Sequence, residues 1–344
     1  MCEATLLNQL IWDKLAMMRF GVLVFIALGC SSTPTTTTHG WSTTTPLPTP
    51  LFESYLTTDG AKLVFLGGIS GVEGDLSTAR PSTRVLFLDP IKGVWVDGPS
   101  LPADAPKHHL TVATIGSEIY VVGGFDGILD SSAHVPFIPV ANAYVLTGGA
   151  WKRLAPQPLA RGAATAQAIN GKIYVTGGSA TEGVAPFSDT FEYDPKADVW
   201  TRKANIPTAR EHLASCALDG KMIVVGGWVG PDDFAQSTVE SYDPTTDGWT
   251  KLPDMSVARG GLAAITFQGA CHALGGEDWK LPFPGTFTTH ESLKSQDSAW
   301  TLLAPMPKAR HGIGVAVLGG HVYVAGGGPG QGNTYTDEVD VFTP

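Results

Sequence analysis

A glycine pair at the end of an apolar run recurs six times along this chain of 344 residues. Successive pairs are 56, 54, 49, 49 and 51 residues apart, and a period near fifty residues is typical of the blades of a β-propeller. Such a period predicts a ring of similar sheets, each built by one repeat. The runs are VFLGG, IYVVGG, IYVTGG, MIVVGG, CHALGG and VYVAGG, and their pairs begin at Gly67, Gly123, Gly177, Gly226, Gly275 and Gly326.

A tryptophan follows the same period. In the third repeat the pattern predicts four strands, a to d, at 160–170, 172–178, 190–195 and 199–204. The pair of Asn170 and Gly171 between strands a and b suits a two-residue hairpin, because both residue types accept a positive φ. The repeated tryptophans, each 26 or 28 residues before the next glycine pair, are Trp41, Trp95, Trp151, Trp200, Trp249 and Trp300.

The order of Gly-Gly, Tyr and Trp in each repeat resembles the kelch family, and the resemblance covers residues 41–344. It implies an all-β fold, a six-bladed kelch-type β-propeller. The last repeat ends at 339–344, before its tryptophan strand, whereas the chain opens its repeats with a tryptophan strand that lacks the rest of a blade. We therefore expect the strand around Trp41 to complete the last blade, so that the ring has no open sheet edge at its joint.

The segment before the repeats resembles a bacterial export signal. Met18 and Arg19 precede an apolar stretch over 20–28, which is too short to span a bilayer but suits a signal core. The stretch ends in Gly29 and Cys30, which resembles a lipoprotein signal whose cysteine is lipidated. An ordinary cleaved signal or an uncleaved anchor is the alternative.

These features predict three parts: a targeting segment over 1–29, a Ser/Thr/Pro tether over 30–40 and the propeller over 41–344. Residues 1–17 are either a mis-assigned start or an extension of the signal. The mature protein is expected to be exported. It is then either lipid-anchored at Cys30 in the bacterial cell envelope, in the outer membrane or periplasm, or secreted.

The charge balance excludes two classes of partner. The formal net charge is −10 and no block of Lys and Arg occurs, which argues against nucleic acid and anionic membrane surfaces. Membrane contact is expected through the lipid anchor alone, and the protein is expected to be a monomer. No C-x-x-C pattern occurs and no spacing enforces metal geometry, so we predict no cofactor and no metal site. Cys216 and Cys271 lie in apolar runs and are expected to be buried free thiols.

The connections between strands b and c are predicted to be long, and those between a and b to be tight turns. Because successive strands alternate in direction, the b–c and d–a connections share one face, which we call the long-loop face, and the others share the turn face. Long loops on a rigid frame are where binding usually occurs. The predicted b–c loops are 69–82, 125–140, 179–188, 228–237, 277–289 and 328–337.

Candidate binding residues lie where strand a begins, at the long-loop end of the central channel. Five repeats carry a cation there. These cations form either a positive ring that binds an anion or internal caps that pair with carbonyls and acids. The cations are Lys107, Arg161, Arg210, Arg259 and Arg310, and the acid/base candidates beside them are His109, Glu211, His212 and His311. Trp228 and Trp279 in the b–c loops are suited to stack on a sugar or a peptide, with packing within the loops as the alternative.

The function predicted from these features is a surface-tethered binding module that presents its b–c and d–a loops to a protein or glycan ligand. The kelch resemblance also admits a sugar-modifying enzyme, similar to sialic-acid epimerase, that would use the cationic channel mouth. The copper chemistry of galactose oxidase is not supported, since the mature repeats hold only Cys216 and Cys271, both in core-like runs. Fold does not decide between these classes, and binding is the preferred prediction over catalysis.

Overall fold

The computed structural model describes residues 40–344 except 74, 128–136, 182–183, 231–233 and 280–284. The predicted targeting segment, Cys30 and the tether up to residue 39 lie outside the described residues. Within the described part of the chain, no helix is long and apolar enough to cross a membrane.

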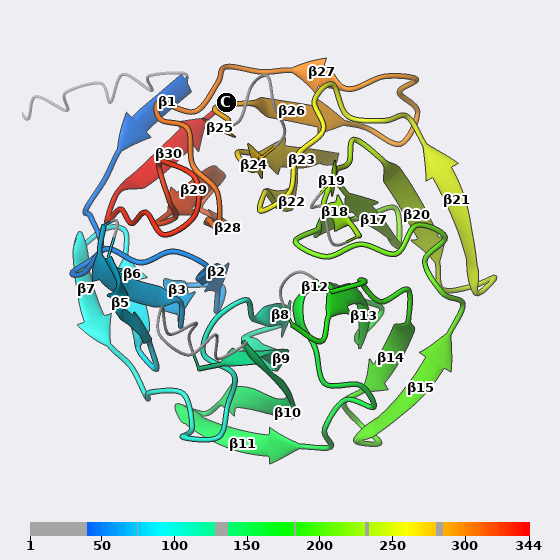
Figure 1. Cartoon of the computed structure of the whole chain (residues 1–344), viewed down its shortest axis with the longest axis horizontal. Coiled ribbons are helices and arrows are strands. Elements are labelled where there is room, and N and C mark those ends of the chain that lie inside the picture. The colour runs from blue at the N-terminus through cyan, green and yellow to red at the C-terminus, as the bar shows by residue number, and fades with distance from the viewer. Residues whose placement is uncertain (1–39, 74, 128–136, 182–183, 231–233, 280–284) are drawn as a thin grey trace, which may run out of the picture. The chain divides into compact units, whose positions relative to one another are not determined.

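Six four-stranded antiparallel sheets form a closed ring, and each sheet is one blade (Figure 1). Strand a of each blade lies at the central channel and strand d at the rim. Blade 1 contains β2 (Tyr55–Thr58), β3 (Leu63–Leu66), β6 (Val85–Asp89) and β7 (Val94–Asp97). Blade 2 contains β8 (Thr111–Ile115), β9 (Glu118–Asp126), β10 (Ile138–Thr147) and β11 (Ala150–Leu154). Blade 3 contains β12 (Gly162–Ile169), β13 (Lys172–Ser179), β14 (Thr190–Asp194) and β15 (Val199–Lys203).

The second half of the ring repeats this order. Blade 4 contains β16 (Ala214–Leu218), β17 (Lys221–Val225), β20 (Val239–Asp243) and β21 (Gly248–Leu252). Blade 5 contains β22 (Ala263–Phe267), β23 (Ala270–Leu274), β26 (His290–Leu293) and β27 (Thr301–Leu302). Blade 6 contains β28 (Gly314–Leu318), β29 (His321–Ala325), β30 (Val339–Thr343) and β1 (Gly40–Thr43).

The ring closes as the sequence predicts. Strand β1 pairs antiparallel with β30, with Trp41 opposite Phe342 and their ring centroids 5.2 Å apart. The Trp41 indole N–H donates to the carbonyl of Ala304 in the connection after blade 5, at 2.8 Å. The first described strand therefore holds blade 6 together and joins it to blade 5, which leaves no exposed sheet edge at the joint.

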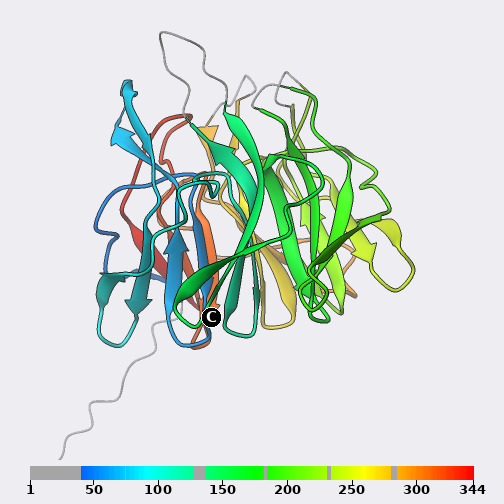
Figure 2. The same ribbon diagram turned by 90° about the horizontal axis from the view of Figure 1, so that it is seen from below.

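The two faces of the ring differ in their connections. Among the residues that the structure describes, three b–c loops carry short two-stranded ladders of their own, and the ladder of β9 and β10 in blade 2 extends beyond a bulge between Val140 and Ala143. Figure 2 shows these extensions on the upper side of the ring and the tight turns on the lower side. The extra ladders are β4 (Ile69–Val72) with β5 (Asp75–Pro81), β18 (Trp228–Val229) with β19 (Phe234–Ala235), and β24 (Glu277–Asp278) with β25 (Gly285–Thr286).

The repeated tryptophans join neighbouring blades at the rim. Each indole N–H donates to a backbone carbonyl just beyond strand d of the preceding blade, with N···O distances of 2.8–3.1 Å. We call these six tryptophans the outer ring. Their acceptors, in the order of the tryptophans from Trp41 to Trp300, belong to Ala304, Thr45, Pro99, Ala155, Ala204 and Pro253.

The glycine pairs mark the place where the backbone of the next blade docks. In blade 3 the N–H of Gly178 donates to the carbonyl of Arg210 at 2.9 Å, and a Cβ on Gly177 would lie 2.6 Å from that oxygen. Both glycines have positive φ, 71° and 83°. The same contact recurs in all six blades, so no side chain fits between the sheets at this place.

One expectation about the core is wrong. Cys216 in strand a of blade 4 and Cys271 in strand b of blade 5 form a disulfide, with their Cα atoms 5.7 Å apart. Both side chains are fully buried in the apolar cluster between the two blades. Sequence spacing does not reveal this pairing, because the two cysteines face one another only after adjacent sheets have packed.

Candidate functional site

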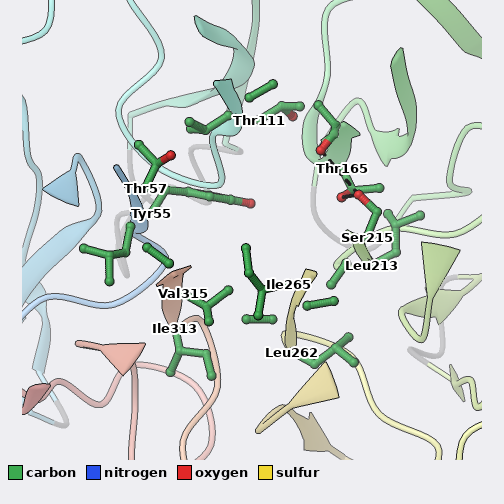
Figure 3. Close-up of a pocket in the computed structure, with 18 of the residues that line it drawn as sticks. Tyr55, Thr57, Thr111, Thr165, Leu213, Ser215, Leu262, Ile265, Ile313 and Val315 are labelled. Atoms are coloured by element: carbon green, nitrogen blue, oxygen red, sulfur yellow. Dashed lines mark hydrogen bonds between the residues drawn. The ribbon is translucent and has the colours of Figure 1, made fainter. Parts of the chain in front are cut away.

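The central channel holds a cavity of about 360 Å³, lined mainly by strand a of each blade. Figure 3 shows hydroxyl side chains from blades 1 to 4 on one part of its wall and aliphatic side chains from blades 5 and 6 on another. Thr165 and Ser215 share a hydrogen bond of 2.6 Å across two blades. Opposite them lie aliphatic residues such as Ile265 and Val315. The cavity therefore suits a small ligand with one polar and one apolar side.

Six residues, one per blade, surround the long-loop end of this cavity, and we call them the mouth ring. Each backbone N–H donates to the carbonyl of the member in the preceding blade, at 2.8–3.2 Å, so six hydrogen bonds close a circle. All six have φ between 48° and 60°, in the left-handed region that disfavours most side chains. The members are Glu53, His109, Ala163, His212, Gly261 and Gly312.

Three members of the mouth ring carry ionisable side chains that converge. Glu53, His109 and His212 are 4–9 % exposed, and each offers one ligand atom within 4.8 Å of the other two. His109 Nε2 lies 3.4 Å from Glu53 Oε2, and the two imidazole rings stand nearly perpendicular with centroids 4.8 Å apart. Non-glycine residues at positive φ are strained, and such strain concentrates at functional positions.

A chain of hydrogen bonds determines the tautomer of His109. His108 Nε2 lies 2.7 Å from the carbonyl of Gly127, which only accepts, so this nitrogen donates. Burial lowers the pKa of His108 to about 4 and the pKa of His109 well below its ordinary value, so both rings are neutral at pH 7. His108 Nδ1 is then an acceptor and receives the proton of His109 Nδ1 at 2.7 Å. The lone pair of His109 Nε2 is consequently the one that faces Glu53.

A second acid/base pair lies beside the mouth ring. Burial raises the pKa of Glu277 to about 8, and its Oε1 is 3.6 Å from His311 Nε2. Burial lowers the pKa of His311 to about 4, and its Nδ1 lies 3.2 Å from the carbonyl of Gly328. At neutral pH a protonated carboxyl therefore lies near an unprotonated imidazole nitrogen. The predicted candidate Glu211 directly precedes the mouth-ring residue His212, and its side chain accepts a hydrogen bond from Ser179.

The expectation of a positive ring at the channel mouth is wrong for the four arginines. Arg161, Arg210, Arg259 and Arg310 have no solvent exposure and do not line the cavity. Arg210 Nη1 donates to the carbonyls of Gly226 at 3.0 Å and Thr238 at 2.7 Å, while Nη2 pairs with Glu240 at 2.8 Å.

The other cations are also paired. Arg161 and Arg310 bind the matching carbonyls of their own blades, and Arg259 Nη1 pairs with Glu291 at 2.7 Å. Lys107 pairs with Asp126 at 2.8 Å. The alternative interpretation, internal caps, describes the four arginines, because their side chains enter the blade. Three of them bond carbonyls at the glycine corner, and Arg259 bonds the carbonyl of Val257 and the carboxylate of Glu291.

The two candidate tryptophans have different environments. Trp228 is buried, with its ring centroid 4.4 Å from that of His212, so it forms the wall behind the mouth ring. Trp279 is 47 % exposed and lies against Gly332 of the next blade, where a Cβ would be 3.3 Å from the indole. Only Trp279 presents an open aromatic surface to a ligand.

The repeat pattern of cations does not identify Glu53 as a site residue. In the repeat of Glu53, the position that holds a cation in the other five repeats is Leu51. The repeats therefore give no reason to select the residues that follow it. The signal that could have found it is its register: Glu53 lies two residues after the cation slot, as His109, His212 and Gly312 do in their repeats.

Comparisons with known proteins agree with the fold. The profile of the KLHDC2/KLHL20/DRC7 Kelch-repeats domain matches residues 96–276, slightly more than half of the chain. The structure titled "Structure of YjhT" superposes with a TM-score of 0.72 at 15 % sequence identity, over 88 % of this chain and 97 % of that chain. Similarity at this level shows a shared fold.

Curated relatives are similar over shorter stretches. Human Kelch repeat and BTB domain-containing protein 12 is 30 % identical over 147 residues, which are 40 % of this chain and 23 % of the relative. Beta-scruin of Limulus polyphemus is 35 % identical over 92 residues, 27 % of this chain and 10 % of the relative. The match thus spans less than a quarter of each relative. With its six blades, repeated glycine pairs and matching profile, the chain belongs to the kelch-repeat family.

Proposed function

We propose that this chain is a binding module whose long-loop face holds a protein partner over the channel mouth. The asymmetry of the two faces carries this proposal: the b–c connections bear extra ladders, whereas the opposite face consists of tight turns (Figure 2). Loops positioned by a rigid scaffold are where recognition usually occurs, and kelch propellers commonly serve as interaction modules.

Exposed apolar side chains on the b–c connections support a protein partner. Val72, Ile138, Val184 and Trp279 come from four different blades and are 37–61 % exposed. Large apolar and aromatic side chains around a concave centre are typical of the anchors of protein interfaces.

The localisation is part of the same proposal. We propose that the chain is exported and anchored through Cys30, as its N-terminal signal predicts. The Cys216–Cys271 disulfide supports an oxidising compartment, since such bonds are rare in reducing ones. The propeller begins with β1 at Gly40. Because β1 is the strand d of blade 6, and each strand d starts at the turn face, the chain enters the propeller on the turn face. The long-loop face would then point away from the membrane.

A matched pair of variants tests the binding face. The propeller is immobilised and exposed to envelope proteins, and retained proteins are quantified by mass spectrometry. Ile138→Asp lies on a b–c connection, whereas Ile91→Asp lies in a c–d turn at 97 % exposure on the turn face. We expect Ile138→Asp to reduce the retained partner at least tenfold and Ile91→Asp to leave it unchanged. Equal loss in both variants, or retention of no protein by the wild type, refutes the proposal.

A sugar-binding or sugar-modifying site is the second candidate, and one observation favours it. The open indole of Trp279 lies close to the Glu277–His311 pair, which is an arrangement of stacking surface and acid/base groups that sugar sites use. The buried arginines remove the argument for an acidic sugar. A thermal-shift screen of neutral and acidic sugars tests this candidate: stabilisation by a neutral sugar that Trp279→Ala abolishes would support it over a protein ligand.

A further inference from the structure

We propose that Glu53, His109 and His212 bind one divalent transition-metal ion of the zinc class at the mouth of the channel. The three residues come from blades 1, 2 and 4, so they do not form a short metal-binding motif in the sequence. This inference is independent of the proposed protein partner, because it concerns side chains inside the ring rather than the apolar rim.

The donor set has the chemistry of a zinc-class site. Two imidazoles and one carboxylate are a common ligand set for Zn²⁺ in sites that keep one coordination position open. Ca²⁺ and Mg²⁺ prefer oxygen ligands alone, and Cu(I) prefers sulfur, so both groups fit these residues less well. Nitrogen and oxygen ligands on a tetrahedral zinc ion are separated by roughly 3.3 Å. The distance of 3.4 Å between His109 Nε2 and Glu53 Oε2 matches that separation.

Geometry places a ligand atom of His109 beside a ligand atom of Glu53. His109 Nδ1 lies 2.7 Å from His108 Nδ1, so Nε2 is the ring nitrogen that lies 3.4 Å from Glu53 Oε2. An ion bound at this point would take both atoms as ligands. His108 then acts as the outer partner that orients a metal-bound imidazole, a role that such hydrogen bonds usually have.

The mouth ring leaves room for the ion and fixes its ligands. The other three members, Ala163, Gly261 and Gly312, have small or no side chains. A Cβ on Gly312 would lie 2.5 Å from Glu53 Oε1, so the ring is shaped around this carboxylate. The closed circle of backbone hydrogen bonds holds the three ligand-bearing Cα atoms in place. Glu53, His109 and His212 also line the cavity, so a water molecule or a ligand group there would complete the coordination of the ion.

The test is metal binding by the tag-free full chain after treatment with EDTA and its removal. Isothermal titration with ZnCl₂ should give one site per chain, and CoCl₂ should give the visible absorption bands of a low-symmetry site with nitrogen ligands. Glu53→Gln and His212→Asn should each weaken zinc binding at least tenfold. His108→Asn should weaken it by roughly 10-fold to 100-fold through the outer partner. His321→Asn, an imidazole beside an a–b turn, is the matched control and should bind as the wild type.

Two results overturn the proposal. One is a wild type that binds no stoichiometric zinc and gives no cobalt bands. The other is a Glu53→Gln/His212→Asn double variant that unfolds at the wild-type temperature in EDTA yet binds zinc with wild-type affinity. If a variant fails to fold, the cobalt spectrum and the zinc stoichiometry of the wild type, together with folded His108→Asn, decide the question.

Discussion

The outer ring and the mouth ring both join all six blades, yet they are built in opposite ways. The outer ring uses the side chain of one residue type, since each tryptophan indole reaches a carbonyl of the preceding blade. The mouth ring uses the backbone alone, through six N–H···O bonds between residues of four types. Where packing needs a particular side chain, the residue repeats. Where the backbone does the joining, the side chains are free to differ and to carry chemistry.

Removing one indole from the outer ring is expected to have the largest effect. Trp249→Ala loses the hydrogen bond to Ala204 and the packing against Tyr242, whose ring centroid is 5.1 Å away. We expect the free energy of unfolding to fall by about 4 kcal/mol. Urea denaturation measures it, and Trp279→Ala, an exposed indole outside the ring, is the control with little loss. A small change in Trp249→Ala would mean that the outer ring does not hold the blades.

The disulfide joins blades 4 and 5 covalently, in addition to the hydrogen bonds of the two rings. Replacing Cys216 and Cys271 together by Ala is expected to lower the free energy of unfolding by about 4 kcal/mol, because the bond closes a loop with a sequence separation of 55 residues. Denaturation of the wild type with and without a reductant should give the same difference as the double variant. Full stability of the double variant would show that the rings alone join these blades.

Two buried histidines beside the outer ring predict a loss of stability in acid. Burial lowers the pKa of both His272 and His290 to about 4, and His290 packs edge-on against Trp41. Between pH 6.5 and 4 the unfolded chain binds more protons, so stability is fully present above pH 6.5 and falls as the pH decreases. At pH 5.5 we expect a loss of about 2 kcal/mol from this pair.

The comparison that isolates this pair is a His272→Leu/His290→Leu variant measured over the same pH range. Its stability should fall less steeply between pH 6.5 and 4 than that of the wild type. The remaining slope belongs to other buried histidines such as His109 and His311 in and beside the mouth ring. An unchanged slope would assign the whole pH dependence to groups outside the pair.

Substitution of a mouth-ring glycine is expected to have the smallest effect. Gly261→Ala places a methyl group 3.4 Å from its nearest atom, so the cost is the positive φ of 60°, about 1 kcal/mol. Gly312→Ala is the matched variant in which the methyl group would meet Glu53 at 2.5 Å. We expect Gly312→Ala to be less stable than Gly261→Ala in thermal unfolding. Equal stabilities would show that the Glu53 carboxylate can move away from the ring.

The sequence predicted the parts of this protein that six repeats must share. The glycine pairs, the tryptophans and the missing last strand gave the blade number, the strand order and the closure by Trp41, because each blade packs against its neighbour through the same contacts. The register of the repeats also brought His109 and His212 to the channel mouth. Shared positions are visible in one dimension since they recur at a fixed period.

Only the tertiary structure decided which repeated residues face inward, outward or one another. The arginines recur in four repeats at the same position, and only the structure shows that all four side chains are buried inside the blades, where Arg210 bonds the carbonyls of the glycine corner. Cys216 meets Cys271, and Glu53 meets His109, as side chains of neighbouring blades. Contacts of this kind depend on how neighbouring blades pack, because the period places the backbone positions but does not show which side chains meet.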